Sequence, residues 1–150
     1  MDLFEEYLQT KETSEWVKRA LIDKSYKNAN QYGGSVNTDL ATYGDAVIKL
    51  CYLELLLDNS KKLSEEKAKF ESDKFLVERV AKHYQLIEHI SKDLQDENLP
   101  NDYDYECTPG ENKNRHKYIA TAVEAMVGAI YKETKDLKPI IELLDSWRKL

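Results

Sequence analysis

Apolar residues recur at steps of three and four along two segments of this chain, a spacing typical of amphipathic helices. The first segment contains Leu40, Tyr43, Val47, Leu50, Cys51 and Leu55, and the second contains Ile119, Ala122, Val123, Met126, Val127 and Ile130. Apart from Glu54 near the end of the first segment, each segment contains a single carboxylate, Asp45 in the first and Glu124 in the second. Because Asp and Glu are almost never fully buried without a partner, two such residues on core helices favour a shared cation.

Gly44 and Gly128 also stand inside these two segments, within four residues of the carboxylates. A glycine in a helix interior costs ~1 kcal/mol relative to alanine. Helices keep such a residue where another backbone or a ligand comes close. We therefore expect the two helices to approach each other at these glycines.

Only five glycines and three prolines occur in 150 residues, which favours long helices. Helical patterns also cover residues 3–24 (interrupted near 10–14), 64–72, 72–84 and 138–147, while residues 28–35 and 95–111 are predicted loops. Residues 46–57 are apolar nearly all round, as in a central helix. The pattern predicts one all-α domain, a helical bundle spanning residues 1–150.

The net charge of −6 excludes nucleic-acid binding by overall charge alone. Binding would instead need a local basic edge, bound cations or a protein partner. No stretch approaches the ~20 consecutive apolar residues of a membrane span, and the acidic start lacks the order of a secretory signal. The two cysteines, Cys51 and Cys107, form no disulfide framework. These features favour a cytoplasmic protein with no membrane partner.

Four segments, taken in order, resemble the catalytic domain of the ribonuclease III family. They are residues 20–26 (ALIDKSY), 37–48 (NTDLATYGDAVI), 72–81 (SDKFLVERVA) and 117–131 (KYIATAVEAMVGAIY). The resemblance runs from about residue 17 to residue 133. Since the chain ends at residue 150, we expect no double-stranded-RNA-binding domain.

The resemblance implies an all-α homodimer, with the signature helices packed together, that cleaves double-stranded or structured RNA during RNA processing, ribosomal RNA maturation included. Asp45 and Glu124 would be its catalytic metal ligands. Mg²⁺ prefers oxygen ligands, often takes only one or two protein carboxylates and keeps several waters. Such an ion, or Mn²⁺ in its place, lowers the pKa of bound water and stabilises charge on the phosphate.

The chain departs from the family's fuller site, which has four acidic positions and of which only Asp45 and Glu124 remain. Thr38 and Ala41 stand where the signature usually carries Glu, and Thr121 stands where an Asp is expected. Thr121 can offer only a neutral hydroxyl, as an outer partner of the site. Two hypotheses follow: an active enzyme resembling the single-domain Mini-III branch, whose pattern shares these departures, or an inactive RNA-binding or ribosome-associated scaffold.

Lys117 matches a family lysine and lies seven residues before Glu124, on nearly the same helical face. With Lys113 and Arg115 it forms a basic edge that we expect to contact RNA phosphates. A solvated lysine is an equally good interpretation. The three histidines have no zinc-like spacing and are expected to be structural or exposed to solvent.

Each carboxylate also has a simpler interpretation as an ion-paired surface residue. Lys49, one turn after Asp45, is a suitable partner for it. Glu124 could pair with Lys117 or Arg115. The metal-site hypothesis therefore depends on the two carboxylates meeting.

Overall fold

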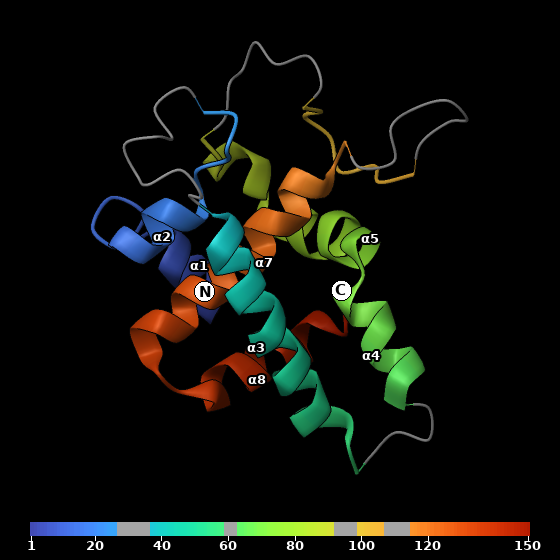
Figure 1. Cartoon of the computed structure of the whole chain (residues 1–150). Helices are drawn as coiled ribbons and strands as arrows, with labels where there is room; N and C mark the ends of the chain where they lie inside the picture. The colour runs from blue at the N-terminus through green and yellow to red at the C-terminus, as the bar shows by residue number, and fades with distance from the viewer. Residues whose placement is uncertain (27–36, 59–62, 92–98, 107–114) are drawn as a thin grey trace.

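The computed structural model describes residues 1–26, 37–58, 63–91, 99–106 and 115–150 (Figure 1). Its helices are α1 (Leu3–Leu8), α2 (Glu15–Ala20), α3 (Thr38–Leu56), α4 (Leu63–Glu71), α5 (Asp73–Phe75), the π-helical η2 (Leu76–Ala81), α6 (Lys82–Tyr84), the 3₁₀ turn η3 (Leu86–His89), α7 (Lys117–Thr134) and α8 (Leu137–Trp147). The described part holds no strand, only an isolated bridge between Ile22 and Ser91. The predicted all-α fold is confirmed.

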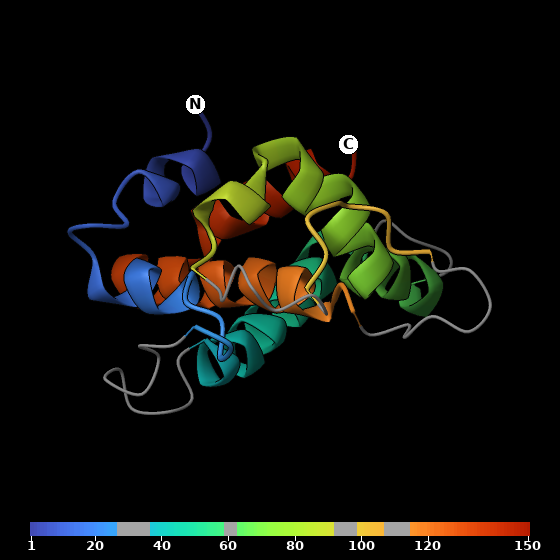
Figure 2. The ribbon, with the colours of Figure 1, turned by 90° about the horizontal axis from the view of Figure 1, so that it is seen from above.

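The helix α7 runs through the middle of the molecule, with α3 on one side and η2 on the other (Figure 2). Its packing against α3 is the most extensive contact between any two elements. The helix α2 also packs on α7, and α8 packs on α3. The side chains of α7 from Tyr118 to Ile130 are buried except those of Thr121 and Glu124. This helix is the central element that its apolar pattern predicts.

Serine caps start two of the helices where the sequence pattern breaks. The Ser14 hydroxyl begins α2 by accepting from the Val17 amide at 3.3 Å, which explains the interruption predicted near residues 10–14. The Ser72 hydroxyl begins α5 in the same way, accepting from the Phe75 amide at 3.1 Å. This second cap fixes the backbone next to Asp73.

A relay of hydrogen bonds joins the two ends of the chain. The Trp147 indole donates to the Tyr84 hydroxyl at 2.7 Å, and that hydroxyl donates to the Asp2 carboxylate at 2.5 Å. The Phe4 ring stacks on Tyr84 with 4.4 Å between ring centroids. Both α1 and α8 are thereby held against α6.

One face of α3 is exposed, which corrects the expectation that residues 46–57 are buried all round. Leu50, Leu53 and Leu57 are 43%, 37% and 62% exposed, respectively. They follow one another at steps of three and four and so form a single apolar stripe. No helix among the described residues is long and apolar enough to cross a membrane.

Candidate metal centre at the α3–α7 crossing

The two helices cross at the predicted glycines with their backbones in contact. A Cβ on Gly44 would lie 1.7 Å from the carbonyl oxygen of Glu124, and one on Gly128 would lie 2.5 Å from that of Leu40. Real Cβ contacts do not come this close, so no side chain fits at either position. The crossing brings the signature segment directly against the backbone of Glu124.

This approach brings the side chains of Asp45 and Glu124 close enough for the charge of Asp45 to act on the Glu124 carboxyl group. Burial, first, and then the neighbouring Asp45 together raise the pKa of Glu124 to about 8. Lys117 opposes this shift. Two carboxyl groups this close repel each other when both are ionised, and a bound cation would neutralise that repulsion.

A third carboxylate, Asp73, faces the same pair from α5. Burial raises its pKa; Lys117 lowers it and the charge of Asp45 raises it. Asp73 also raises the pKa of Glu124, so the three acids share one electrostatic environment. Sequence reasoning missed this residue, although it stands in the segment 72–81, because nothing in the helical spacing links that segment to α3 and α7.

The ion pair expected between Asp45 and Lys49 is present in the structure. Its Oδ2 forms an ion pair with the Lys49 Nζ at 2.8 Å, with side chains that are 35% and 49% exposed. Solvent screens an exposed pair of this kind, so a bound cation could displace the lysine at little cost. Asp45 therefore interacts with both Lys49 and Glu124.

Only part of the predicted basic edge lies at these carboxylates. Lys117, the exposed first residue of α7, interacts electrostatically with both Asp73 and Glu124. Arg115 acts on Asp102, whose pKa it lowers. Lys113 lies outside the described residues.

The replaced family positions leave neutral side chains near the crossing. Thr38 is exposed at the start of α3, and Ala41 is buried. Thr121 is half-buried on α7, three residues before Glu124 and thus on a similar face. Its role as an outer partner of the site stays a prediction.

The donor atoms at the crossing suit a hard cation, because carboxylate oxygens are the ligands that Mg²⁺ prefers. The ligand oxygens of Asp45, Glu124 and Asp73 do not all lie within 4.8 Å of one another. A cation there would take the first two directly and Asp73 through water, in keeping with the several waters that Mg²⁺ retains.

Among the described residues, Asp2, Glu5 and His83 do place three ligand atoms within that distance. The Asp2 oxygens, however, already accept from the Glu5 amide and from Tyr84. This second group has a structural explanation as a helix cap and as one end of the relay to α8.

Comparison with known proteins identifies the stretch that contains the crossing. The model of the Ribonuclease III domain family matches residues 38–135, which begin with α3 and end just after α7. Asp45, Asp73 and Glu124 all lie inside this match. No curated protein and no solved structure matches the chain.

Proposed function

The chain belongs to the ribonuclease III family, and on that basis we propose that it is a divalent-metal-dependent endoribonuclease with its catalytic centre at Asp45 and Glu124. Members of the family are typically endoribonucleases that act on double-stranded RNA, and they generally depend on a divalent metal. The observation that carries the proposal is the pair of carboxyl groups that the glycine crossing brings together. Two acidic side chains in a partly buried site are costly to keep close together, and a bound cation is the simplest explanation for their position.

A magnesium ion at this centre would supply water of lowered pKa and would neutralise charge on the scissile phosphate. Asp45 and Glu124 would hold it, and Mn²⁺ is an alternative ion. Glu124 must lose its proton for this purpose, and its raised pKa makes that loss sensitive to pH. Lys117 is exposed at the beginning of α7 and can bind a phosphate oxygen of the substrate.

Three neutral residues, Thr38, Ala41 and Thr121, favour a second candidate function. They remove acids that the fuller family site carries, so a scaffold that binds RNA or the ribosome without cleaving it is the alternative. We favour cleavage because Asp73 adds negative charge to the centre from a separate element. Such a minimal site resembles that of the Mini-III branch.

We also propose that the active form is a homodimer, since members of the family usually form dimers. The exposed stripe of Leu50, Leu53 and Leu57 supports an interface along α3. A second copy of the chain would cover this stripe with its own α3. The dimer would bind double-stranded or structured RNA, and ribosomal RNA precursors are the first natural substrates to test. Its compartment would be the cytoplasm.

The test is cleavage of labelled double-stranded RNA with Mg²⁺, and with Mn²⁺ in parallel. Asp45→Asn and Glu124→Gln should each lower the cleavage rate by at least about 100-fold, as expected for loss of a group that stabilises transition-state charge. Asp73→Asn should lower it by about 10-fold, the effect of an outer partner of a metal. Glu142→Gln, a matched change on the exposed surface of α8, should leave the rate unchanged.

Two results would overturn the proposal. A wild-type protein that binds the RNA but does not cleave it would establish the scaffold alternative. Equal cleavage by wild type, Asp45→Asn and Glu124→Gln would place the catalytic centre elsewhere or reveal a contaminating nuclease.

A further inference from the structure

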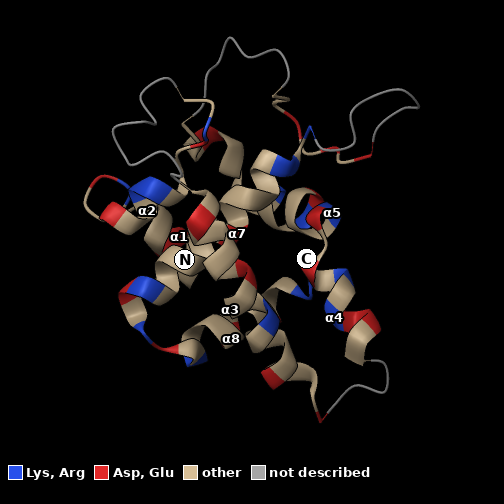
Figure 3. Cartoon of the chain, in the orientation of Figure 1, with Lys and Arg blue, Asp and Glu red and all other residues tan. Residues whose placement is uncertain are grey.

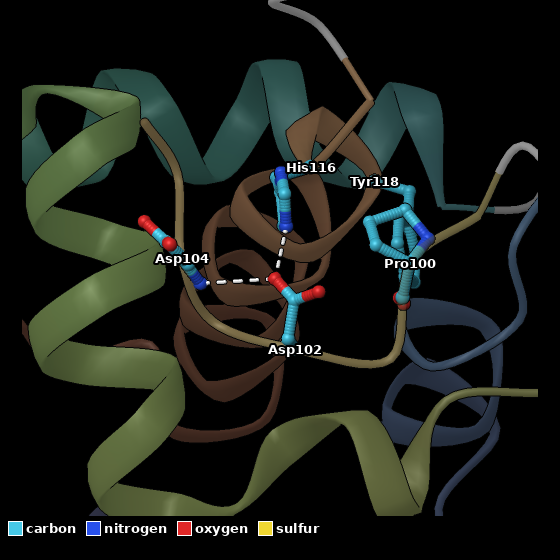
Figure 4. Close-up of polar contacts among 5 residues, drawn as sticks. All are labelled: Pro100, Asp102, Asp104, His116 and Tyr118. Atoms are coloured by element: carbon cyan, nitrogen blue, oxygen red, sulfur yellow. Dashed lines mark hydrogen bonds and ion pairs between the residues drawn. The ribbon is translucent and has the colours of Figure 1, made fainter. Parts of the chain in front are cut away.

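Residues 99–106, which we call the strap, are attached to the helices by hydrogen bonds that do not involve the carboxylates of Asp104 and Glu106. The Tyr118 hydroxyl donates to the Pro100 carbonyl oxygen (Figure 4). The Tyr103 hydroxyl accepts from the Ile87 amide at 3.1 Å. The strap is thereby fixed at the start of α7 and at η3.

A buried histidine makes the third attachment. His116 is 2% exposed, and its Nε2 lies 2.6 Å from the Asp102 Oδ1, which also accepts from the Asp104 amide at 3.1 Å (Figure 4). Burial alone would raise the pKa of Asp102, but these two hydrogen bonds hold it below its usual value. The carboxylates of Asp104 and Glu106 play no part in these attachments.

Three exposed cations, Lys74, Arg79 and Lys82, lie on the helical run from α5 to α6 that faces the strap. A hollow of about 450 Å³ lies between this helical run and the strap. It is lined by Glu78, Arg79, Lys82, Asp102, Tyr103 and Asp104. A second hollow of about 190 Å³ shares Glu78 and Arg79 with the first and extends to Lys74. Both signs of charge therefore meet on this side of the helices, as Figure 3 shows for α5.

The strap supplies two anions to this contact, Asp104 and Glu106, beside Glu78 of η2. Glu106 forms an ion pair with Lys74, and Asp104 shares the larger hollow with Arg79 and Lys82. Because the side chains of Lys74 and Glu106 are 50% and 71% exposed, their ion pair is weak and readily exchanged. A carboxylate placed on a lysine in this way occupies the position that a phosphate oxygen would take.

The cationic residues continue directly from the proposed metal centre, because Lys74 follows Asp73 in the chain. We propose that Lys74, Arg79 and Lys82 form a binding surface for the phosphate backbone of RNA, which Asp104 and Glu106 of the strap occupy in the free protein. RNA binding then exchanges strap carboxylates for phosphates. The exchange favours a duplex of high charge density over weakly charged ligands, because only the former displaces both carboxylates. This inference rests on the proposed function for its choice of RNA as the ligand.

The test is the binding of a labelled RNA duplex, followed by fluorescence anisotropy in EDTA so that no metal-dependent cleavage occurs. The double variant Asp104→Asn/Glu106→Gln should lower Kd by about 3–10-fold at low salt, since it removes two competing anions. Glu142→Gln is the matched control and should leave Kd unchanged. The difference between the variants should shrink as salt is raised.

The cations are tested in the same assay. Lys74→Ala/Arg79→Ala should raise Kd by at least about 10-fold and reduce the slope of log Kd against log salt by about 2, one for each lost phosphate contact. Lys138→Ala, on the exposed surface of α8, is the control. Added to the cation variant, which keeps only Lys82 of the three cations, the strap substitutions should tighten binding much less than they do in the wild type.

A strap variant that binds RNA with the wild-type Kd, or a cation variant that behaves like Lys138→Ala, would overturn the inference. If the wild type cleaves RNA while the strap variants bind unchanged, the inference fails and the proposed function stands. If the predicted shifts in Kd occur but no protein cleaves RNA, the proposed function fails and the inference stands. A duplex that binds to none of the proteins would contradict both. Glu106→Gln alone, which touches only an exposed ion pair, serves if the double variant unfolds.

Discussion

The helices α3 and α7 have similar lengths and similar apolar patterns, yet their surroundings differ. Each carries one glycine at the crossing and one proposed metal ligand. Most of α7 is covered by its own chain, whereas α3 leaves Leu50, Leu53 and Leu57 exposed. An apolar pattern thus tells how much of a helix needs covering, and only the tertiary structure tells whether the same chain supplies the cover.

The contact between α3 and α7 should be the most sensitive to substitution. Gly44→Ala should lower the free energy of unfolding by more than about 3 kcal/mol, because the new Cβ would collide with the Glu124 carbonyl oxygen and force two backbones apart. Ala46→Gly, at an exposed position of the same helix, should cost only about 1 kcal/mol. Chemical denaturation measures both. Equal costs for the two variants would show that the helices do not touch at Gly44.

The side of α3 that α7 does not cover can be tested by its effect on association. Leu53→Glu/Leu57→Glu should raise the dimer dissociation constant by at least about 100-fold, because two apolar residues central to an interface become charged. The fold of each monomer should persist, since both side chains are already exposed. Sedimentation velocity measures the association state. Leu150→Glu, at another exposed leucine, should leave the dimer intact, and a wild type that stays monomeric would contradict the proposed interface.

A smaller effect tests the titration of Glu124. The pKa of Glu124 is higher in the folded chain, about 8, than its ordinary value of 4.5. Its contribution to stability is therefore complete below pH ~4.5 and is lost as the pH rises through 8. In EDTA, Glu124→Gln should be more stable than wild type at pH 9 by about 1–2 kcal/mol, a figure reduced from the full shift because the side chain is partly exposed to screening solvent.

Thermal unfolding at pH 5 and pH 9 measures this difference, with Glu142→Gln as the control. Mg²⁺ should reverse the order at pH 9, because it binds the ionised wild-type pair and not the variant. An advantage for Glu124→Gln that is the same at both pH values would show that the side chain does not titrate in this range.

The sequence predicts the crossing well because its signals are local. Helical spacing predicts α3 and α7. Gly44 and Gly128, which destabilise a helix unless another backbone comes close, predict the point of contact. Asp45 and Glu124 then come together as a consequence. Asp73 could not be found in this way, because its approach depends on how α5 packs against α7, and helical spacing carries no information about that contact.

The strap shows a second limit of the same kind. The sequence predicts residues 95–111 as an exposed acidic loop, and the exposed side chains of Asp102 and Asp104 agree with that prediction. In the same segment Pro100 is buried, and Tyr103 is half-buried and accepts a hydrogen bond from η3. Charge predicts which side chains stay in water, but the attachments of an irregular segment depend on partners that are distant in the sequence.

The relay from Trp147 through Tyr84 to Asp2 gives the molecule an internal optical reporter. Trp147 is 1% exposed and hydrogen-bonded, whereas Trp16, the other tryptophan, is half-buried and contacts the cations of Arg19 and Lys132. A buried indole emits at shorter wavelength than one in contact with water. The short-wavelength part of the emission therefore reports whether the two ends of the chain are docked, and it does so from a place that metal and RNA need not touch.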